Sequence, residues 1–291
     1  MSISKLVLVT GATGNQGGSV VQALLTQGHQ VRALTRNPAS PAAKRLSEQG
    51  VEIAVGDFTD HDSLVSAAHG VDAVYAMSTP FEQGVEKETA QGIAMTNAVK
   101  AAGVGHLVYS SVASADRATG IPHFDSKYEV EKHIISSGVP YTIIAPVYFM
   151  DNMLQPWALP NLRQGKLALA MPSTRSLQQI AVVNIGAFAA AVIERRDTVF
   201  GRYIDIAGDE LTGDEAATIL SKVTGREIRY EGIPPEVLRA QSEDMALMFE
   251  WFDSTGYAVD INGLRRDFPE VKWHNFEEWA LKQDWTVLDQ S

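Results

Sequence analysis

A glycine-rich turn near the start of the sequence limits the possible folds more than any other feature. An apolar run over residues 5–10 leads into residues 11–18 (GATGNQGG), and residues 19–27 have the pattern of a helix. Between a buried strand and a helix, Gly11 permits a tight turn, Gly14 lets the backbone approach a pyrophosphate, and Gly17 lets the helix pack on the strand. The free N–H groups at the start of such a helix also attract phosphate. The turn therefore predicts a dinucleotide site, and the alternative is a glycine-rich turn of another α/β protein. We expect the dinucleotide to contact Gly11, Thr13, Gly14, Asn15, Gln16 and Gly17.

Beyond the turn, apolar runs of strand length alternate with helical stretches. Strands are expected at residues 30–35, 51–55, 72–77, 106–110 and 141–145, and helices at 42–49, 62–68, 86–102 and 126–137. Alternation at these lengths predicts parallel strands joined by right-handed crossovers. The expected fold is a doubly wound parallel (Rossmann) sheet, with its ligand at the carboxyl ends of the strands.

The rhythm of the sequence changes after residue 151, which suggests a second, smaller α/β lobe. A strand and a helix within residues 178–207 are expected to rejoin the main sheet, and the helix expected from residue 212 belongs to the lobe. We therefore expect a nucleotide-binding domain over residues 1–155, joined by residues 178–207, and a substrate-binding lobe over residues 156–291.

Composition and charge exclude several classes of function. The net charge of −11 argues against nucleic acid or an anionic membrane as a partner, because both need clustered Lys and Arg. The sequence contains no cysteine, which excludes disulfides, thiolate metal sites and cysteine nucleophiles. No His, Asp or Glu group has metal-ligand spacing, so no metal is expected. Neither a signal peptide nor a membrane helix is apparent, and we expect a cytoplasmic protein.

The end of the second predicted strand indicates which dinucleotide binds. A carboxylate about 20 residues after the glycine turn would hold the ribose 2′-hydroxyl of NAD(H). Thr35 and Arg36 stand there instead, and Arg36 can form a forked pair with a 2′-phosphate and stack on adenine. This favours NADP(H). Asp57 and Phe58, after the third strand, are expected at the adenine edge and face, and a simple turn residue is the alternative for Asp57.

Several of these stretches together resemble the NmrA-like family, whose members are atypical short-chain dehydrogenases/reductases. The stretches are residues 10–20, 36–38, 56–58, 123–127, 146–152 and 243–249, which extend over nearly the whole chain. The resemblance implies one of two functions. The first is an NADP(H)-dependent reductase of quinones or other small carbonyl or conjugated compounds. The second is a nucleotide-sensing regulator that does little or no chemistry and acts through a protein partner.

The sequence departs from the superfamily at the catalytic position. The usual pair is a tyrosine four residues before a lysine, and here His123 precedes Lys127 at that spacing. We expect Lys127 on the first turn of a helix, where the positive helix end and the cofactor lower its pKa. It could then bind the nicotinamide ribose and is the candidate proton donor, and a lysine that only binds ribose is the alternative. Sugar-nucleotide epimerisation shares the fold but normally needs the absent tyrosine.

Other polar side chains could assist Lys127. His123, expected in a loop after Pro122, could relay a proton or could simply pack there. Ser111, at the end of the fifth strand, could bond a substrate oxygen or only end the strand. Tyr148 could replace the missing phenol, although packing against the nicotinamide ring is favoured. Further cofactor contacts are expected from Ser78, Thr79, Pro146, Tyr148 and Phe149.

Large apolar side chains suggest a pocket for a small hydrophobic or aromatic substrate. The candidates are Phe81, Phe149, Met150, Met153, Trp157, Met248, Trp251 and Phe252. Ordinary core packing is the alternative for each of them. A homodimer and a protein partner both stay open.

Overall fold

The computed structural model describes residues 3–81 and 83–289. The chain forms two compact units. Unit 1 consists of Met1–Arg117, Pro122–Ala145 and Ile185–Asp205, and unit 2 consists of Ala118–Ile121, Pro146–Asn184 and Ile206–Ser291. Residues 146–155 and 178–184, which we had assigned to the nucleotide-binding domain, therefore lie in unit 2.

The main sheet is built on unit 1 and confirms the predicted doubly wound fold. Within the described residues it has seven strands, in the spatial order β10-β6-β5-β4-β1-β2-β3. They are β1 (Leu6–Val9), β2 (Gln30–Thr35), β3 (Glu52–Val55), β4 (Ala73–Ala76), β5 (Leu107–Ser110), β6 (Tyr141–Pro146) and β10 (Tyr203–Ile206). Neighbouring strands from β3 to β6 pair in parallel. The order reverses between β1 and β4, and this switch point is where doubly wound sheets bind their ligands.

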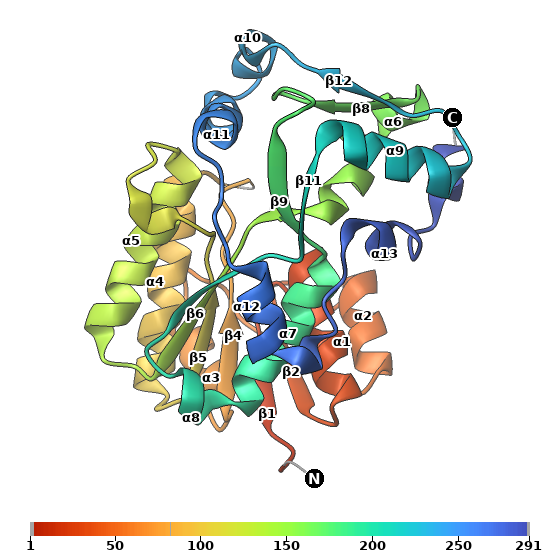
Figure 1. Cartoon of the computed structure of the whole chain (residues 1–291). Helices are drawn as coiled ribbons and strands as arrows, with labels where there is room; N and C mark the ends of the chain where they lie inside the picture. Colours follow the sequence, from red (N-terminus) through yellow and green to blue (C-terminus); the bar gives the residue numbers. More distant parts are fainter. Residues whose placement is uncertain (1–2, 82, 290–291) are drawn as a thin grey trace. The chain divides into compact units, whose positions relative to one another are not determined.

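Helices cover both faces of this sheet (Figure 1). Those of unit 1 are α1 (Asn15–Thr26), α2 (Pro41–Glu48), α3 (His61–Ala68), α4 (Val85–Ala101), η1 (Ala115–Arg117), α5 (Pro122–Ser137) and α8 (Arg196–Val199), with most of α7 (Val182–Glu194). Apolar residues of α3, α4 and α5 form one core with the strands. Because both faces are covered, β4 and β5 are completely buried and their sequences are almost continuously apolar.

Glycines bring two pairs of helices in unit 1 into close contact. A Cβ added at Gly92 of α4 would lie 2.6 Å from the methyl groups of Val130 on α5. One added at Gly186 of α7 would lie 2.3 Å from Oγ of Ser19 on α1. Since real Cβ atoms do not approach other atoms so closely, glycine at position 92 sets the spacing of α4 and α5.

Unit 2 carries small sheets of its own. Its strands are β7 (Tyr148–Phe149), β8 (Lys166–Leu169), β9 (Ser176–Ile180), β11 (Asp209–Thr212) and β12 (Arg229–Gly232). In the described part of the chain, β9 pairs with β11 and β7, and β8 pairs with β12. The prediction that a strand near residue 179 rejoins the main sheet is therefore wrong, and the chain returns there only with β10.

Helices enclose a second core in unit 2. They are η2 (Met150–Leu154), α6 (Leu159–Arg163), α9 (Gly213–Thr224), α10 (Pro235–Arg239), α11 (Glu243–Ser254), α12 (Ile261–Asp267), η3 (Pro269–Val271), α13 (Phe276–Ala280) and η4 (Trp285–Leu288). Helix α9 begins with a capping box between Thr212 and Glu215, close to the predicted start. Across residues 3–81 and 83–289, no helix is both long and apolar enough to cross a membrane.

Candidate active site

The glycine turn has the backbone geometry that its sequence predicts. Gly11 has a φ of 63°, which favours glycine, and a Cβ at Gly17 would lie 2.3 Å from the Gly11 carbonyl oxygen. A Cβ at Gly14 would meet the same oxygen at 3.4 Å, an ordinary contact. The fold itself therefore requires glycine at positions 11 and 17 but not at 14, where the missing side chain leaves room for a ligand.

The start of α1 is suited to an anion. Gly14 is its N-cap, and among the described residues no side chain caps the helix and no carboxylate lies in its first turn. Thr13, Gly14 and Asn15 are exposed. Gln16 donates from Nε2 to Oγ of Ser110 at 2.7 Å, which ties the turn to the end of β5. The exposed backbone N–H groups at this helix start suit a dinucleotide phosphate.

The turn is also tied to the end of β4. The Thr10 hydroxyl donates to the Met77 carbonyl at 3.1 Å and accepts from the Met77 amide at 2.9 Å. Beyond Met77, Ser78 is buried and its hydroxyl lies 3.3 Å from that of Tyr109, whereas Thr79 is half-buried. The carboxyl ends of β1, β4 and β5 thus meet at the switch point of the sheet.

Arg36 is exposed directly after β2. Hydrogen bonds from the Thr59 hydroxyl and amide lower the pKa of Asp57, and the charge of Arg36 lowers it further. The Asp57 carboxylate accepts both bonds from Thr59, which stabilise the turn after β3. Phe58 is half-buried and packs against the core of unit 1.

Lys127 lies in a buried polar cluster of unit 1. Its Nζ is 2.8 Å from Oε1 of Glu88 on α4 and donates to the Ser78 carbonyl at 3.0 Å. The same nitrogen lies 5.9 Å from the centre of the Tyr109 ring. The ammonium is thus held at the end of β4, beside the end of β5.

The prediction that the pKa of Lys127 is lowered is wrong. Burial alone would lower it, but Tyr109 and Glu88 raise it by more, and Glu131 adds to the rise, so that the pKa is above its ordinary value. Helix α5 also begins at Pro122, four residues before the predicted start, because proline is favourable in the first turn of a helix. Lys127 consequently lies further from the positive helix end than expected.

His123 lies on α5 and not in the expected loop. It is buried, with its ring 4.8 Å from that of Phe124 and 6.0 Å from that of Phe81. Phe81, predicted for the substrate pocket, is 73% exposed. The position that usually holds the tyrosine therefore holds an imidazole packed among rings.

Ser111 contacts a second buried carboxyl group. Its hydroxyl donates to Oε1 of Glu131, one turn beyond Lys127 on α5, and both side chains are buried. Burial raises the pKa of Glu131 to about 7; the bond from Ser111 opposes this rise, and the charges of Asp116 and Asp205 add to it. At neutral pH this carboxyl group consequently holds its proton for part of the time.

Unit 2 contains the other predicted cofactor contacts. Pro146 is buried at the end of β6, and Tyr148 and Phe149 form β7. Burial raises the pKa of the Tyr148 phenol, which packs edge-on against the rings of Phe249 and Phe252. Phe149 is half-buried. Tyr148 is therefore held in an aromatic cluster in which ionisation is unfavourable.

The residues predicted to line a substrate pocket differ widely in burial. Met150 and Met153 belong to the core of unit 2, and the cavity beside Met153 has only about 10 Å³, room for one water at most. Met248 and Phe252 are also buried, Trp251 is half-buried beside Phe252, and Trp157 is 56% exposed. For the two core methionines the packing alternative is correct, because residues far along the chain cover them.

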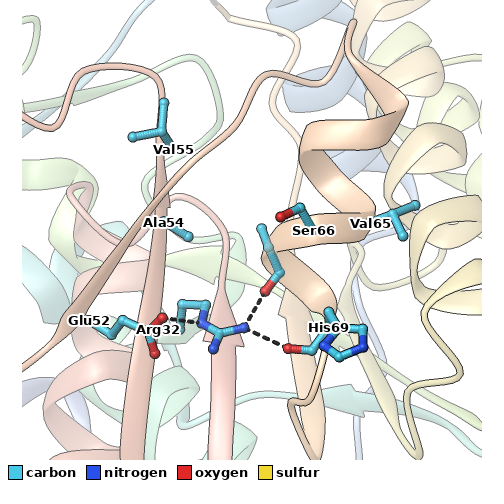
Figure 2. A pocket seen from close by; sticks show the side chains of 8 residues that line it. Arg32, Glu52, Ala54, Val55, Val65, Ser66 and His69 are labelled. Carbon is cyan, nitrogen blue, oxygen red and sulfur yellow. Dashed lines mark hydrogen bonds and ion pairs between the residues drawn. The ribbon is translucent and has the colours of Figure 1, made fainter.

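A larger hollow of about 500 Å³ lies elsewhere in unit 1 (Figure 2). None of the side chains that line it is a predicted site residue. Arg32 in this hollow donates to the carbonyls of Ala67 and His69 at the end of α3, each at 2.8 Å, and pairs with Glu52. These contacts satisfy backbone carbonyl groups at the C-terminal end of α3, so Arg32 has a structural role in this hollow. Within residues 3–81 and 83–289, no group of three or more His, Asp or Glu side chains could hold a metal ion.

Sequence reasoning missed Glu88 and Tyr109. A signal for Glu88 was present, because it precedes Gly92 and Met95 by four and seven residues and so shares the buried face of α4. Tyr109 lies in a buried apolar strand, where a tyrosine is indistinguishable from ordinary core.

Known proteins resemble this chain over most of its length. The sequence profile of the NmrA-like family matches residues 3–280. An NmrA-like family domain-containing protein of Dictyostelium discoideum is 30% identical, over 96% of this chain and 98% of that protein. Quinone oxidoreductase 2 of Escherichia coli is 28% identical, over 78% of each. The crystal structure of an NADPH-dependent quinone oxidoreductase from E. coli, complexed with NADPH, has a TM-score of 0.79 and 25% identity, covering 94% of this chain and 98% of that one. This chain therefore belongs to the NmrA-like family.

Proposed function

We propose that this protein is an NADP(H)-dependent oxidoreductase that reduces a small quinone, carbonyl or other conjugated compound. One observation carries the proposal. The ammonium of Lys127 is held by the Ser78 carbonyl at the end of β4, and the glycine turn is hydrogen-bonded to the end of the same strand. A phosphate-binding turn and a proton-bearing group thus meet at one switch point, within unit 1.

The residues of unit 1 would hold NADP(H) from two sides. The glycine turn and the uncapped start of α1 offer backbone N–H groups to the pyrophosphate. Arg36 offers a guanidinium to the 2′-phosphate, and Asp57 and Phe58 follow the neighbouring strand. When bound, the reduced cofactor supplies hydride.

Lys127 would supply the matching proton. Its ammonium stays charged at neutral pH, so it can donate a hydrogen bond to the nicotinamide ribose and a proton to the substrate oxygen that becomes negative. One hydride and one proton complete the two-electron reduction of a carbonyl or a quinone. Lys127 then recovers its proton from solvent before the next turnover.

The relatives support a flat, uncharged substrate. The E. coli relative and the NADPH-bound structure are both quinone oxidoreductases by name. We propose that unit 1 binds the nucleotide.

The test is NADPH oxidation in the presence of a panel of quinones, aldehydes and enones. Turnover is expected with at least one of them, and Lys127→Ala should lower kcat by roughly 100-fold while NADPH affinity falls far less. Lys132→Ala is the matched control, because Lys132 is on the same helix with its side chain 48% exposed. An unchanged kcat in Lys127→Ala would contradict the role of this lysine.

The histidine at the tyrosine position favours a second candidate function. A protein that binds NADP(H) without turnover, and signals the cofactor state to a protein partner, needs no phenol at position 123. Tight NADPH binding together with no turnover across the whole panel would favour this sensor and refute the reductase.

A further inference from the structure

Glu88 is a buried carboxylate in the candidate site that the proposed reaction does not yet use. It lies on the first turn of α4 and is completely buried. A buried carboxylate is costly unless every oxygen finds a partner. Oε1 pairs with the Lys127 ammonium at 2.8 Å, and Oε2 accepts a hydrogen bond from the Ser126 hydroxyl at 2.5 Å. Both oxygens of Glu88 are therefore directed at α5.

The contact between α4 and α5 is held by more than the ion pair. Gly92 follows Glu88 by four residues on α4. A side chain at this position would collide with Val130 on α5. The Thr89 hydroxyl of α4 also donates to the Ser126 carbonyl of α5 at 3.3 Å. The carboxylate is thus delivered to Lys127 by a packed helix pair and not by a mobile surface side chain.

We infer that Glu88 is the positioning residue for Lys127: its carboxylate holds the ammonium and directs it to the end of β4. The inference rests on the proposed function for its catalytic meaning. The other titratable groups that act on Lys127 are Tyr109 from β5 and Glu131 from α5. Glu88 itself contacts Nζ of Lys127 directly, through its Oε1 at 2.8 Å. Without it, burial would lower the pKa of Lys127 and the ammonium would lose its anchor on α4.

The direct test measures the titration of Lys127 without any turnover. In protein labelled with carbon-13 at lysine Cε, the Lys127 resonance is assigned by its absence from Lys127→Arg, and its shift is followed against pH. Glu88→Gln should lower the titration midpoint by about one pH unit or more, and Glu88→Asp should restore much of it. Glu86→Gln, an exposed position on the same helix, should leave it unchanged. An unchanged midpoint in Glu88→Gln would overturn the inference.

The kinetic test connects this titration to the proposed reaction. In the pH profile of kcat with a quinone, the alkaline limb of Glu88→Gln should move down to the midpoint found by NMR, so that the rate one pH unit above it is roughly tenfold lower. If Glu88→Gln lowers the titration midpoint of Lys127 but neither wild type nor any variant reduces a substrate, Glu88 still holds Lys127 and the reductase proposal fails. If turnover occurs and the alkaline limb does not move, the positioning role is refuted.

A stability test covers the case in which Glu88→Gln folds poorly. Removing one member of a buried ion pair leaves the other charge without its partner, whereas removing both leaves none. The double variant Glu88→Gln with Lys127→Met should therefore recover most of the Tm that Glu88→Gln loses. A double variant no more stable than Glu88→Gln alone would contradict the pairing.

Discussion

The pH dependence of stability provides a sharp test of the buried cluster on α5. The change is Glu131→Gln, which keeps the shape of the side chain and an oxygen that can accept the bond from Ser111. In the unfolded chain Glu131 titrates near its ordinary value of 4.5, and in the folded protein burial raises its pKa to about 7. The variant therefore removes one titration that differs between the two states.

The size and sign of the effect follow from these two values. Below about pH 4.5, Glu131 is protonated in both the folded and the unfolded state, so its titration does not change the free energy of unfolding. Between 4.5 and about 7, the unfolded chain releases the proton while the folded protein keeps it, so stability falls as pH rises. Above about pH 7 the loss levels off, at about 3 kcal/mol for the whole interval. Relative to wild type, Glu131→Gln should thus gain about 2–3 kcal/mol in free energy of unfolding between pH 5 and pH 8.

Urea denaturation followed by tryptophan fluorescence, at several pH values from 5 to 8.5, measures this difference. Subtracting wild type from the variant cancels the contributions of all other titrating groups. Glu129→Gln is the matched control, because Glu129 is on the same helix with its side chain 56% exposed, and it should show almost no pH dependence relative to wild type. A difference between Glu131→Gln and wild type that stays constant from pH 5 to 8.5 would refute the reasoning.

Three further changes test other parts of the argument. Arg36→Ala should weaken NADPH binding roughly 10- to 100-fold and leave NADH binding nearly unchanged in a fluorescence titration. Equal losses of affinity for NADPH and NADH would contradict a contact between Arg36 and the 2′-phosphate. Gly17→Ala should abolish nucleotide binding and cost about 1–3 kcal/mol of stability, while Gly18→Ala, whose Cβ would make only an ordinary contact at 3.4 Å, should bind normally. Gly92→Ala should lower the free energy of unfolding by about 1–3 kcal/mol, and the double variant with Val130→Ala should recover part of this loss in thermal unfolding. Losses that simply add in the double variant would show that the two sites do not touch.

Much of unit 1 could be predicted from the sequence because its signals are local. The φ of Gly11 and the close approach at Gly17 are demands of a single turn, and only glycine meets them. Strands covered on both faces need continuous apolar runs, so their positions could be predicted within a few residues and their parallel pairing from the alternation with helices. Family membership follows from the same stretches and extends over residues 3–280.

The start of α5 and the fate of β9 were less accessible. Pro122 can end one segment or open a helix, and the choice depends on the surrounding packing. The apolar run at residues 180–183 predicts a strand, but periodicity does not say which sheet a strand joins. The burial of Met150 and Met153 likewise depends on later segments of unit 2 that cover them.

The sequence by itself determined the glycine turn, the doubly wound sheet and the family. Only the tertiary structure decided the state of the lysine. A lysine near a helix start would have its pKa lowered, whereas Lys127 meets Glu88, which lies 39 residues earlier on another helix, and its pKa rises instead. Charge–charge interaction depends on distance and burial, and both are set when α4 packs against α5.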